Sequence, residues 1–441
     1  MKSKKTKMLS VVLAVLLSCI GIPFTAFANS DMNESTSENL IQEISYAKDG
    51  DTIYIDGTVV IDKVITMDKD ITLAGKNNAR LIRAKGYQDK MVNIKANVSM
   101  NDLSISGENE IVDACAICVS EGAVFNMNSG SICYNKTYFS GAGIYNKGTV
   151  NIYDGIICNN TARLDGAGVY NRGTLNMFGG EIDFNKAGNS GGGVYTNKLF
   201  NLSGGKIYNN TASQLGGGVI NTRETGCNST QPQINISGGE ISCNTSETHG
   251  GGICSECGKI EISGGKIYKN AALYGGNLIM NTTLSISGGE ITSNEAVLGG
   301  GLCCMVVDCT MDGGIISNNK AMYGAGIANI NSYFTMTGGE ISFNESTNAK
   351  QPIGMGGGMF NSSSILEMQG GKIVNNTADL FAGGVYNDAK SKCIKSGNAA
   401  IEGNSPADIY DVPPFDGSDF EVNNMISQIK SLSENIELPI A

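Results

Sequence analysis

A short turn motif that ends in glycine, in most copies Gly-Gly, recurs along the chain, mostly every 24 to 26 residues. Before it comes an alternating apolar run, as in residues 174–177, and after it comes in most copies Glu or Lys followed by Ile. Period-two alternation bounded by glycine is typical of short β-strands and not of helices. Two longer intervals predict loop insertions near residues 221–233 and 346–355. The last glycine of the motif falls at Gly130, Gly155, Gly180, Gly205, Gly239, Gly265, Gly289, Gly314, Gly339 and Gly371.

A unit of this length with three short strands cannot bury its own apolar face, but copies stacked on one another can. The repeat therefore predicts an all-β chain, a right-handed parallel β-helix with about 25 residues per coil. Parallel stacking puts equivalent residues about 4.7–4.9 Å apart, so each repeat position becomes a column. One column consists of asparagines, whose amides can hydrogen-bond from rung to rung. Its members are Asn135, Asn160, Asn185, Asn210, Asn244, Asn270, Asn294, Asn319, Asn344 and Asn376, continuing to Asn404.

The residue after Gly-Gly alternates in charge over five repeats: Glu181, Lys206, Glu240, Lys266 and Glu290. Stacked like charges would repel one another, whereas alternation makes each neighbour an opposite charge. The pattern predicts that these rungs are adjacent and in register.

Four regions follow from the repeat and its ends. Residues 1–28 read as a signal peptide, 29–48 as an N-terminal cap, 49–404 as the β-helix, and 405–441 as a C-terminal cap or tail. Residues 37–48 can form a short amphipathic helix over the open end of the solenoid, where unpaired strand edges need cover.

The leader has a basic start, an apolar stretch and an A-x-A site that predicts cleavage near Ala28. We expect a secreted or cell-surface protein; a lipoprotein anchored through Cys19 is the weaker alternative. No later apolar run reaches the length of a membrane span, so none is expected in the mature chain. The net charge of −11 argues against nucleic-acid binding.

The order Asn-Asn-x-Ala followed by Gly-Gly-Gly-Val, in residues 209–219, resembles the repeats of polymorphic outer membrane proteins. Residues 49–55 and 71–75 resemble the start of right-handed β-helices of the pectate-lyase-like superfamily. The resemblance covers about residues 40–404. It implies a surface-exposed or secreted protein, often an adhesin.

Enzymes of this superfamily cleave acidic polysaccharides with clustered Asp residues and a basic residue or a histidine. Within the glycine repeats arginines are sparse, the sole histidine, His249, is followed by three glycines, and neither an Asp-Asp pair nor Arg-x-Lys occurs. We therefore assign no catalytic residue and expect no cofactor. A polysaccharide lyase or glycoside hydrolase remains the alternative.

Two groups of cysteines each allow more than one interpretation. Cys243, His249, Cys254 and Cys257 lie within one repeat, a weak candidate for a metal site because Cys-x-x-Cys has ligand spacing. A local disulfide or small apolar side chains would explain them equally. Cys133 and Cys158 share a column in adjacent rungs, where either a disulfide or stacked free thiols would fit.

Binding is the function that the repeat favours. The position before the second glycine turn stays uncharged over seven rungs and includes His249, Tyr274, Tyr323 and Phe381, while another column begins with Tyr145, Tyr170 and Tyr195. If exposed, these columns would form an aromatic stripe suited to a glycan or to a host or cell-surface protein. If covered, they would pack on one another or beneath loops. The expected function is non-catalytic adhesion or glycan or protein binding.

Overall fold

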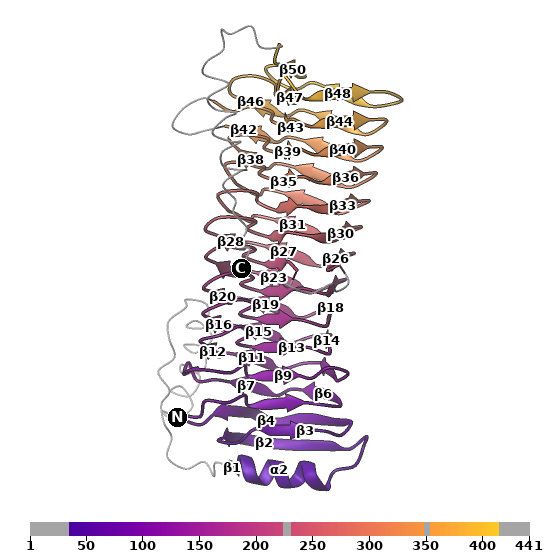
Figure 1. Ribbon diagram of the computed structural model, residues 1–441. Helices are drawn as coiled ribbons and strands as arrows, with labels where there is room; N and C mark the ends of the chain where they lie inside the picture. The colour runs from indigo at the N-terminus through magenta and orange to yellow at the C-terminus, as the bar shows by residue number, and fades with distance from the viewer. Residues whose placement is uncertain (1–34, 224–230, 348–352, 414–441) are drawn as a thin grey trace, which may run out of the picture. The chain divides into compact units, whose positions relative to one another are not determined.

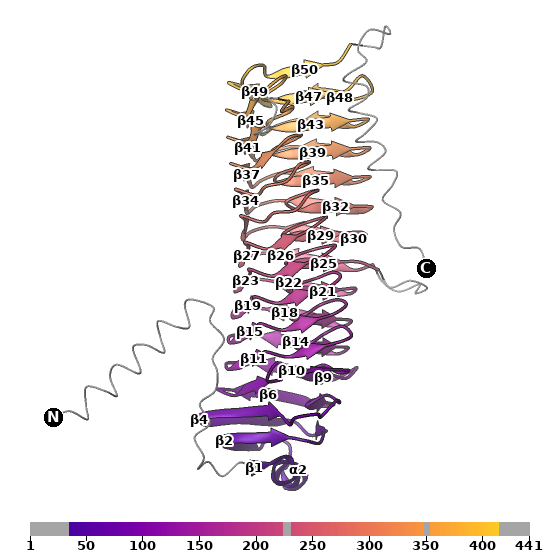
Figure 2. The same ribbon diagram turned by 90° about the vertical axis from the view of Figure 1, so that its left-hand side faces the viewer.

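Short strands separated by glycine-rich turns stack into a parallel β-solenoid of about 14 turns with about 25 residues per turn. The computed structural model describes residues 35–223, 231–347 and 353–413. Figures 1 and 2 show the turns lying one above another, with their strands aligned from turn to turn. The predicted all-β fold and repeat length are confirmed.

Each turn passes through up to four strand positions, named here the first to fourth series in chain order. The first series is β2 (Thr52–Ile61), β4 (Ile71–Arg83), β6 (Asn97–Asn101), β10 (Val124–Met127), β14 (Thr149–Ile152), β18 (Thr174–Met177), β22 (Leu199–Leu202), β26 (Gln233–Ile236), β30 (Gly258–Ile262), β33 (Thr282–Ile286), β36 (Asp308–Met311), β40 (Tyr333–Met336), β44 (Ile365–Met368) and β48 (Lys392–Lys395). The second series is β7 (Ser104–Ser106), β11 (Ser131–Cys133), β15 (Ile156–Cys158), β19 (Glu181–Asp183), β23 (Lys206–Tyr208), β27 (Glu240–Ser242), β31 (Lys266–Tyr268), β34 (Glu290–Thr292), β37 (Ile315–Ser317), β41 (Glu340–Ser342), β45 (Lys372–Val374) and β49 (Ala400–Glu402). The long strand β4 pairs with both β6 and β7 and so joins these two series into one sheet.

The third series is short, and the fourth is continuous along the solenoid. The third series is β8 (Ile111–Val112), β12 (Lys136–Thr137), β16 (Thr161–Ala162), β20 (Lys186–Ala187), β24 (Thr211–Ala212), β28 (Thr245–Ser246), β38 (Lys320–Ala321), β42 (Glu345–Ser346) and β46 (Thr377–Ala378). The fourth series is β3 (Ile65–Met67), β5 (Val92–Ile94), β9 (Ile117–Val119), β13 (Ile144–Asn146), β17 (Val169–Asn171), β21 (Val194–Thr196), β25 (Val219–Asn221), β29 (Ile253–Ser255), β32 (Leu278–Met280), β35 (Leu302–Met305), β39 (Ile327–Ile330), β43 (Met359–Ser362), β47 (Val385–Asn387) and β50 (Ile409–Asp411).

The interior of the solenoid is apolar and continuous along its length. In one turn, Leu175 of the first series, Ile182 of the second and Val194 of the fourth are all fully buried. Their neighbours Thr174 and Asn176 point outward because successive side chains on a strand alternate between its faces. Burial of these columns is the main stabilising term of the fold.

The chain bends before each third-series position at a residue in the left-handed region, such as Phe184 with φ of 51°. This conformation is unfavourable for a bulky side chain, so its surroundings must hold it in place. The buried asparagine that follows does so. Asn160 Nδ2 donates to Asn185 Oδ1 at 2.9 Å and to the Ile132 carbonyl at 2.9 Å, and the Asn160 amide N–H donates to Asn185 Oδ1 at 3.0 Å.

The same asparagine contacts repeat from Asn135 to Asn404, so the predicted ladder is confirmed. At the far end Asp408 takes the place of a further asparagine. Its Oδ1 accepts from both the amide N–H and Nδ2 of Asn404, at 2.9 Å each.

The charged column after Gly-Gly is also in register as predicted. Glu181 pairs with Lys206, Lys206 with Glu240, Glu240 with Lys266, and Lys266 with Glu290. Lys266 Nζ lies 3.0 Å from Glu290 Oε2. Exposed pairs of this kind add at most about 1 kcal/mol, so their main effect is on register.

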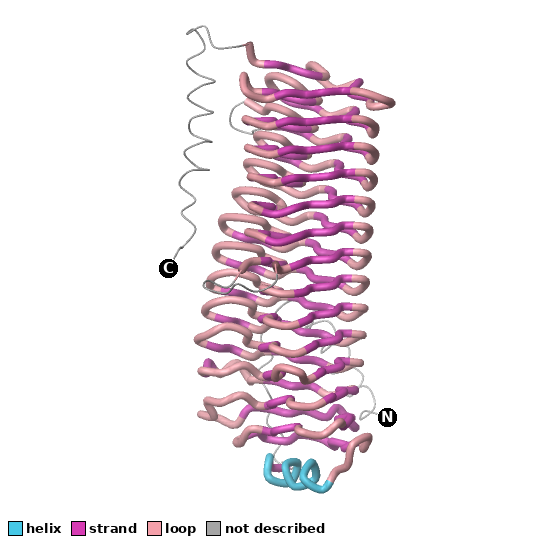
Figure 3. The backbone as a smooth tube through the Cα atoms, turned by 45° about the vertical axis from the view of Figure 1, so that its right-hand side comes forward, coloured by secondary structure: helices cyan, strands magenta, loops and turns pink. Residues whose placement is uncertain are grey.

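One end of the solenoid is covered by helix α2 (Ser37–Tyr46), which follows the short strand β1 (Ser35–Thr36). Leu40 and Ile44 are buried, and the helix packs against β2 and β3. Figure 3 shows this helix closing the N-terminal end. The capping helix predicted over 37–48 is present but ends at Tyr46.

The last described strand, β50, pairs with β47, so the parallel pairing continues beyond residue 404. The predicted leader with Ala28 and Cys19, most of the C-terminal tail, and the centres of both insertions lie outside the described residues. Within the described ranges, no helix is long and apolar enough to cross a membrane.

Candidate functional site

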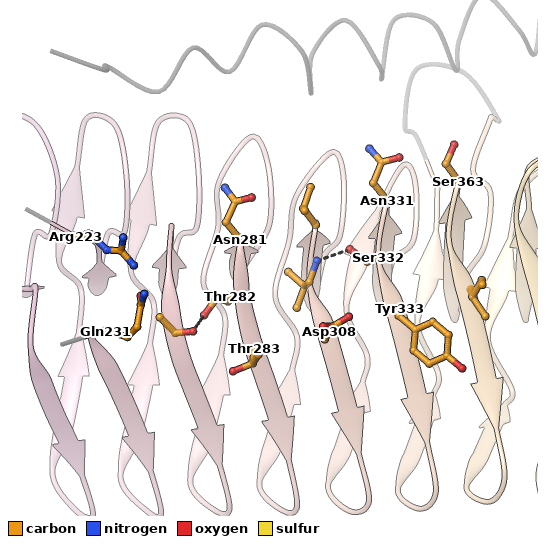
Figure 4. Close-up of a pocket in the computed structure, with 14 residues that line it drawn as sticks. Arg223, Gln231, Asn281, Thr282, Thr283, Asp308, Asn331, Ser332, Tyr333 and Ser363 are labelled. Carbon is orange, nitrogen blue, oxygen red and sulfur yellow. Dashed lines mark hydrogen bonds between the residues drawn. The ribbon is translucent and has the colours of Figure 1, made fainter. Parts of the chain in front are cut away.

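A hollow lies at the corner where the fourth series passes into the first. It has a volume of about 740 Å³ and draws its walls from successive turns, so it runs along the solenoid (Figure 4). Its lining residues are Arg223, Gln231, Gly258, Asn281, Thr282, Thr283, Val306, Val307, Asp308, Asn331, Ser332, Tyr333, Ser363 and Ile365. We call this hollow the corner groove.

The corner groove exists because the chain turns here through left-handed residues. Asn281, Val306, Asn331 and Ser363 have φ between 47° and 56° in four successive turns. Asn tolerates this region through its short polar side chain. The corner residues of three of these turns, Asn281, Val306 and Asn331, are exposed along one edge of the groove.

Serine hydroxyls hold the floor of the groove together. The Val307 N–H donates to Ser332 Oγ, and the Ser332 N–H donates to Ser364 Oγ, each at 3.0 Å. Ser332 Oγ in turn donates to the Ile330 carbonyl at 2.7 Å. Buried corner amides are thus paired, which makes the groove a fixed surface before any ligand arrives.

The outer wall is a column of first-series side chains. Thr283 pairs in register with Asp308, Asp308 with Tyr333, and Tyr333 with Ile365. Tyr333 is 37% exposed, and its hydroxyl donates to the Glu367 carboxylate of the next turn. That bond raises the pKa of Tyr333 and fixes the direction of its ring. An oriented, exposed aromatic ring beside hydroxyl and amide groups suits a sugar ring.

A second hollow of about 410 Å³ continues along the same corner in earlier turns and shares Gln231 with the corner groove. Its lining residues are Gly122, Lys147, Gly148, Thr149, Gly173, Thr174, Lys198, Leu199, Gln231 and Gln233. Three positively charged residues, Lys147, Lys198 and Arg223, and one negatively charged residue, Asp308, line the two hollows. The corner is therefore locally cationic in a chain whose net charge is −11, which favours anionic ligands.

The predicted column before the glycine turn lies elsewhere and is largely covered. His249, Tyr274 and Tyr323 pair with their neighbours from turn to turn. Tyr323 is only 6% exposed, and its ring lies 5.7 Å from that of the buried Phe360. Phe381 is half-buried and lies 5.8 Å from the buried Tyr386.

These side chains form a second, smaller hydrophobic core between the glycine-rich loops and the outer face of the fourth series. Its buried members are Ile220, Cys254, Leu278, Met280, Leu298, Cys303, Met305, Tyr323, Ala328, Ile330, Met355, Phe360, Ala382 and Tyr386. Tyr274, Tyr323 and Phe381 therefore pack in or against this second core and do not line an open groove.

The predicted tyrosines of the other column stack on each other. The rings of Tyr145 and Tyr170 are 5.1 Å apart and those of Tyr170 and Tyr195 are 4.5 Å apart. All three are half-buried, and burial raises the pKa of Tyr170 to about 12. Lys147 lies over the Tyr145 ring at 5.7 Å and also lines the second hollow, so this stack borders the corner.

The weak metal candidate does not assemble. Cys243 is exposed, Cys254 is buried in the second core, and the ring of His249 lies against Tyr274 at 5.1 Å. Burial lowers the pKa of His249, which keeps its imidazole neutral. Among the residues that the structure describes, no three His, Cys, Asp or Glu side chains come together as metal ligands, Cys257 included. Cys133 and Cys158, in contrast, form a disulfide with a Cα–Cα distance of 4.7 Å.

One acidic cluster was missed by the sequence reasoning. Glu181 and Asp183 point outward from β19, and Tyr208 Oη of the next turn donates to Glu181 Oε2 at 2.9 Å. Asp183 is 7% exposed and its Oδ1 has no partner. Burial raises the pKa of Asp183 to about 6. The sequence did contain a signal for this cluster. Asp183 follows Glu181 by two residues, so both lie on the same face of the strand, and the other residues in the column of Asp183 are mostly uncharged.

Asp183 makes stability depend on pH in a defined direction. Because its pKa is about 6 when folded and about 3.9 when unfolded, protonation favours the folded state. Its ionisation therefore costs stability as pH rises through 6, and Asp183→Asn should be more stable than wild type by about 1 to 2 kcal/mol at pH 8. The difference should vanish near pH 4 in urea unfolding. Asp154→Asn, at an exposed carboxylate of the preceding turn, is the matched control. Equal pH profiles for the two variants would contradict the assignment.

The described chain was compared with protein-family models, curated proteins and solved structures, and none of the three comparisons found a match.

Proposed function

We propose that the protein is a secreted or cell-surface, non-catalytic binding protein that holds an extended anionic glycan along the corner groove. The observation that carries this proposal is the groove itself: a fixed hollow along the solenoid, lined by hydroxyls, amides and one exposed tyrosine. A polymer lying along the axis would meet similar polar groups at every turn, about 4.8 Å apart.

The sign of the charge selects among glycans. Lys147, Lys198 and Arg223 line the corner with only Asp308 to oppose them. Asn281, Asn331 and Gln231 also line the groove, and their amide groups can hydrogen-bond to sugar hydroxyls. A uronate-containing or sulfated polysaccharide matches this lining better than a neutral one.

The test is binding of acidic and neutral polysaccharides by glycan array and calorimetry. Tyr333→Ala should weaken binding of an acidic polysaccharide about tenfold, since it removes the oriented ring. Tyr138→Ala, at a tyrosine that is 45% exposed outside the groove, is the matched control and should bind as wild type. Arg223→Gln should reduce both the affinity and its salt dependence. Equal binding by all three variants would remove the groove from consideration.

Glycoside hydrolysis is the second candidate, and the Glu181, Asp183 and Tyr208 cluster is the observation that favours it. A carboxyl group with a raised pKa beside a second carboxylate is the arrangement of a general acid and its partner. A lyase has less support, because the two hollows contain a single carboxylate, Asp308. Incubation with acidic polysaccharides should release neither reducing ends nor unsaturated products if the binding proposal is right. Release that is abolished by Asp183→Asn would establish the hydrolase instead.

A further inference from the structure

Cys115 and Cys118 form a Cys-x-x-Cys pair where the chain runs into the fourth-series strand β9. Cys115 is 8% exposed, whereas Cys118 is half-buried on the outer face of β9. The two thiols lie near enough to shift each other's pKa. One thiol is thus partly open to solvent and the other, three residues earlier in the chain, is buried, which matches an attacking and a resolving thiol.

The segment around the pair is held in place by a buried guanidinium. Arg83 is 4% exposed, and it donates to the carbonyls of Tyr87 at 3.1 Å, of Asp89, and of Cys115 at 3.4 Å. These bonds fix the loop that carries Lys90 beside the backbone of Cys115. The pair is therefore part of a rigid site.

Two cations act on the accessible thiol. The neighbouring Cys115 thiol and the charges of Lys90 and Lys147 lower the pKa of Cys118 to about 7. The neighbouring Cys118 thiol and burial raise the pKa of Cys115. Burial also raises the pKa of Cys254, Cys303 and Cys309, which keeps those thiols protonated and unreactive.

We infer that Cys115 and Cys118 form a thiol–disulfide exchange site, in which Cys118 attacks a low-molecular-weight disulfide and Cys115 resolves the mixed disulfide. In the first step the Cys118 thiolate attacks one sulfur of the disulfide; that S–S bond breaks, and the first thiolate leaves and takes up a proton. In the second step Cys115 loses its proton and attacks Cys118 Sγ, and the second thiol is released. The small disulfide is reduced to two thiols while the protein pair is oxidised to an internal disulfide.

The location of Cys118 gives the site a binding surface. Cys118 pairs in register with Tyr145, the first ring of the tyrosine stack. A disulfide approaching Cys118 would therefore lie against an aromatic ring, and Lys90 and Lys147 would attract carboxylates on the disulfide. The exchange site shares Lys147 with the second hollow, but the exchange itself requires no glycan in the corner groove.

The test uses the full-length protein after reduction and desalting, with glutathione disulfide as the oxidant and peptide mass spectrometry as the readout. Wild type should form the internal Cys115–Cys118 disulfide and release two glutathione molecules. Cys115→Ser should accumulate glutathione on Cys118, because the resolving thiol is missing. Cys243→Ser removes an exposed, solitary cysteine and should leave the reaction unchanged.

Alkylation provides a second readout that does not require exchange. The rate of iodoacetamide reaction at Cys118 in Cys115→Ser and in wild type should be compared with the rate at Cys243. In wild type, Cys118 should react about threefold faster than Cys243 at pH 7, and its rate should follow a midpoint near pH 7. Failure of Cys115→Ser to trap glutathione, or reaction of Cys118 no faster than Cys243, would overturn the inference. Circular dichroism of the variants checks that the solenoid remains folded.

Discussion

Asn185→Ala is expected to lower the free energy of unfolding by about 4 kcal/mol. The Asn185 side chain accepts from the N–H and the Nδ2 of Asn160, at 3.0 and 2.9 Å, and donates to the Ile157 carbonyl at 2.9 Å and to Asn210 Oδ1 at 3.0 Å. Alanine would leave the buried Asn160 N–H without its acceptor and would remove one hydrogen bond each from Asn160 Nδ2, the Ile157 carbonyl and Asn210 Oδ1. A buried group left unpaired costs about 1–3 kcal/mol. Urea unfolding measures the loss, and hydrogen exchange at the Asn160 amide should rise most.

The matched control lies in the same turn. Asn176 belongs to an outer asparagine column, where its Nδ2 donates to Asn151 Oδ1 at 2.8 Å and its Oδ1 accepts from Asn201 at 2.7 Å. It is half-exposed, so water can replace both bonds, and Asn176→Ala should cost less than about 1 kcal/mol. Equal losses for the two variants would contradict the expectation that burial makes the inner asparagine column the more costly one to break.

Gly173→Ala is expected to destabilise the solenoid by roughly 3 kcal/mol or more. A Cβ at Gly173 would lie 2.0 Å from the carbonyl oxygen of Gly148 in the preceding turn, which is backbone and cannot rotate away. The neighbouring Thr174 N–H donates to that same oxygen at 2.9 Å, so separating the turns would also break this bond. Urea unfolding should show a lower free energy of unfolding for the variant. The second hollow should be lost as well, because Gly173 lines it.

Gly122 provides the control for this collision. It lines the same hollow, but a Cβ there would meet no atom within 4 Å. Its φ of 79° still disfavours a side chain, so Gly122→Ala should cost only about 1 to 2 kcal/mol. A loss at Gly122 as large as that at Gly173 would mean that backbone conformation, and not the spacing of the turns, is the constraint at this corner.

The register of the fold could be predicted from the sequence because parallel stacking turns a repeat position into a column. Asn160 and Asn185, which are 25 residues apart, are ladder neighbours, and Lys266 and Glu290 are paired as their alternation requires. The strands, the glycine turns and the capping helix follow from local patterns of the same kind.

The candidate sites were much less predictable. Tyr274 and Tyr323 were correctly placed in one column, but the spacing of residues along a chain does not tell which columns face each other. The glycine-rich loops bring that column against the outer face of the fourth series, so the expected stripe became a second core. The corner groove escaped prediction because it depends on left-handed residues such as Asn281 and Asn331, whose φ the repeat does not reveal.

The sequence by itself therefore determined the solenoid, its register and its asparagine ladder, because each of these requires only that one turn resemble the next. The tertiary structure alone decided which outward side chains are covered and which remain open. Tyr323 and Asp183 are buried, Tyr333 is exposed in the groove, and Cys115 is buried whereas Cys118 is partly open to solvent. The physical reason is that the exposure of an outward side chain depends on where the neighbouring loops and corners run. Contacts between segments that are separated along the chain determine the paths of those loops and corners.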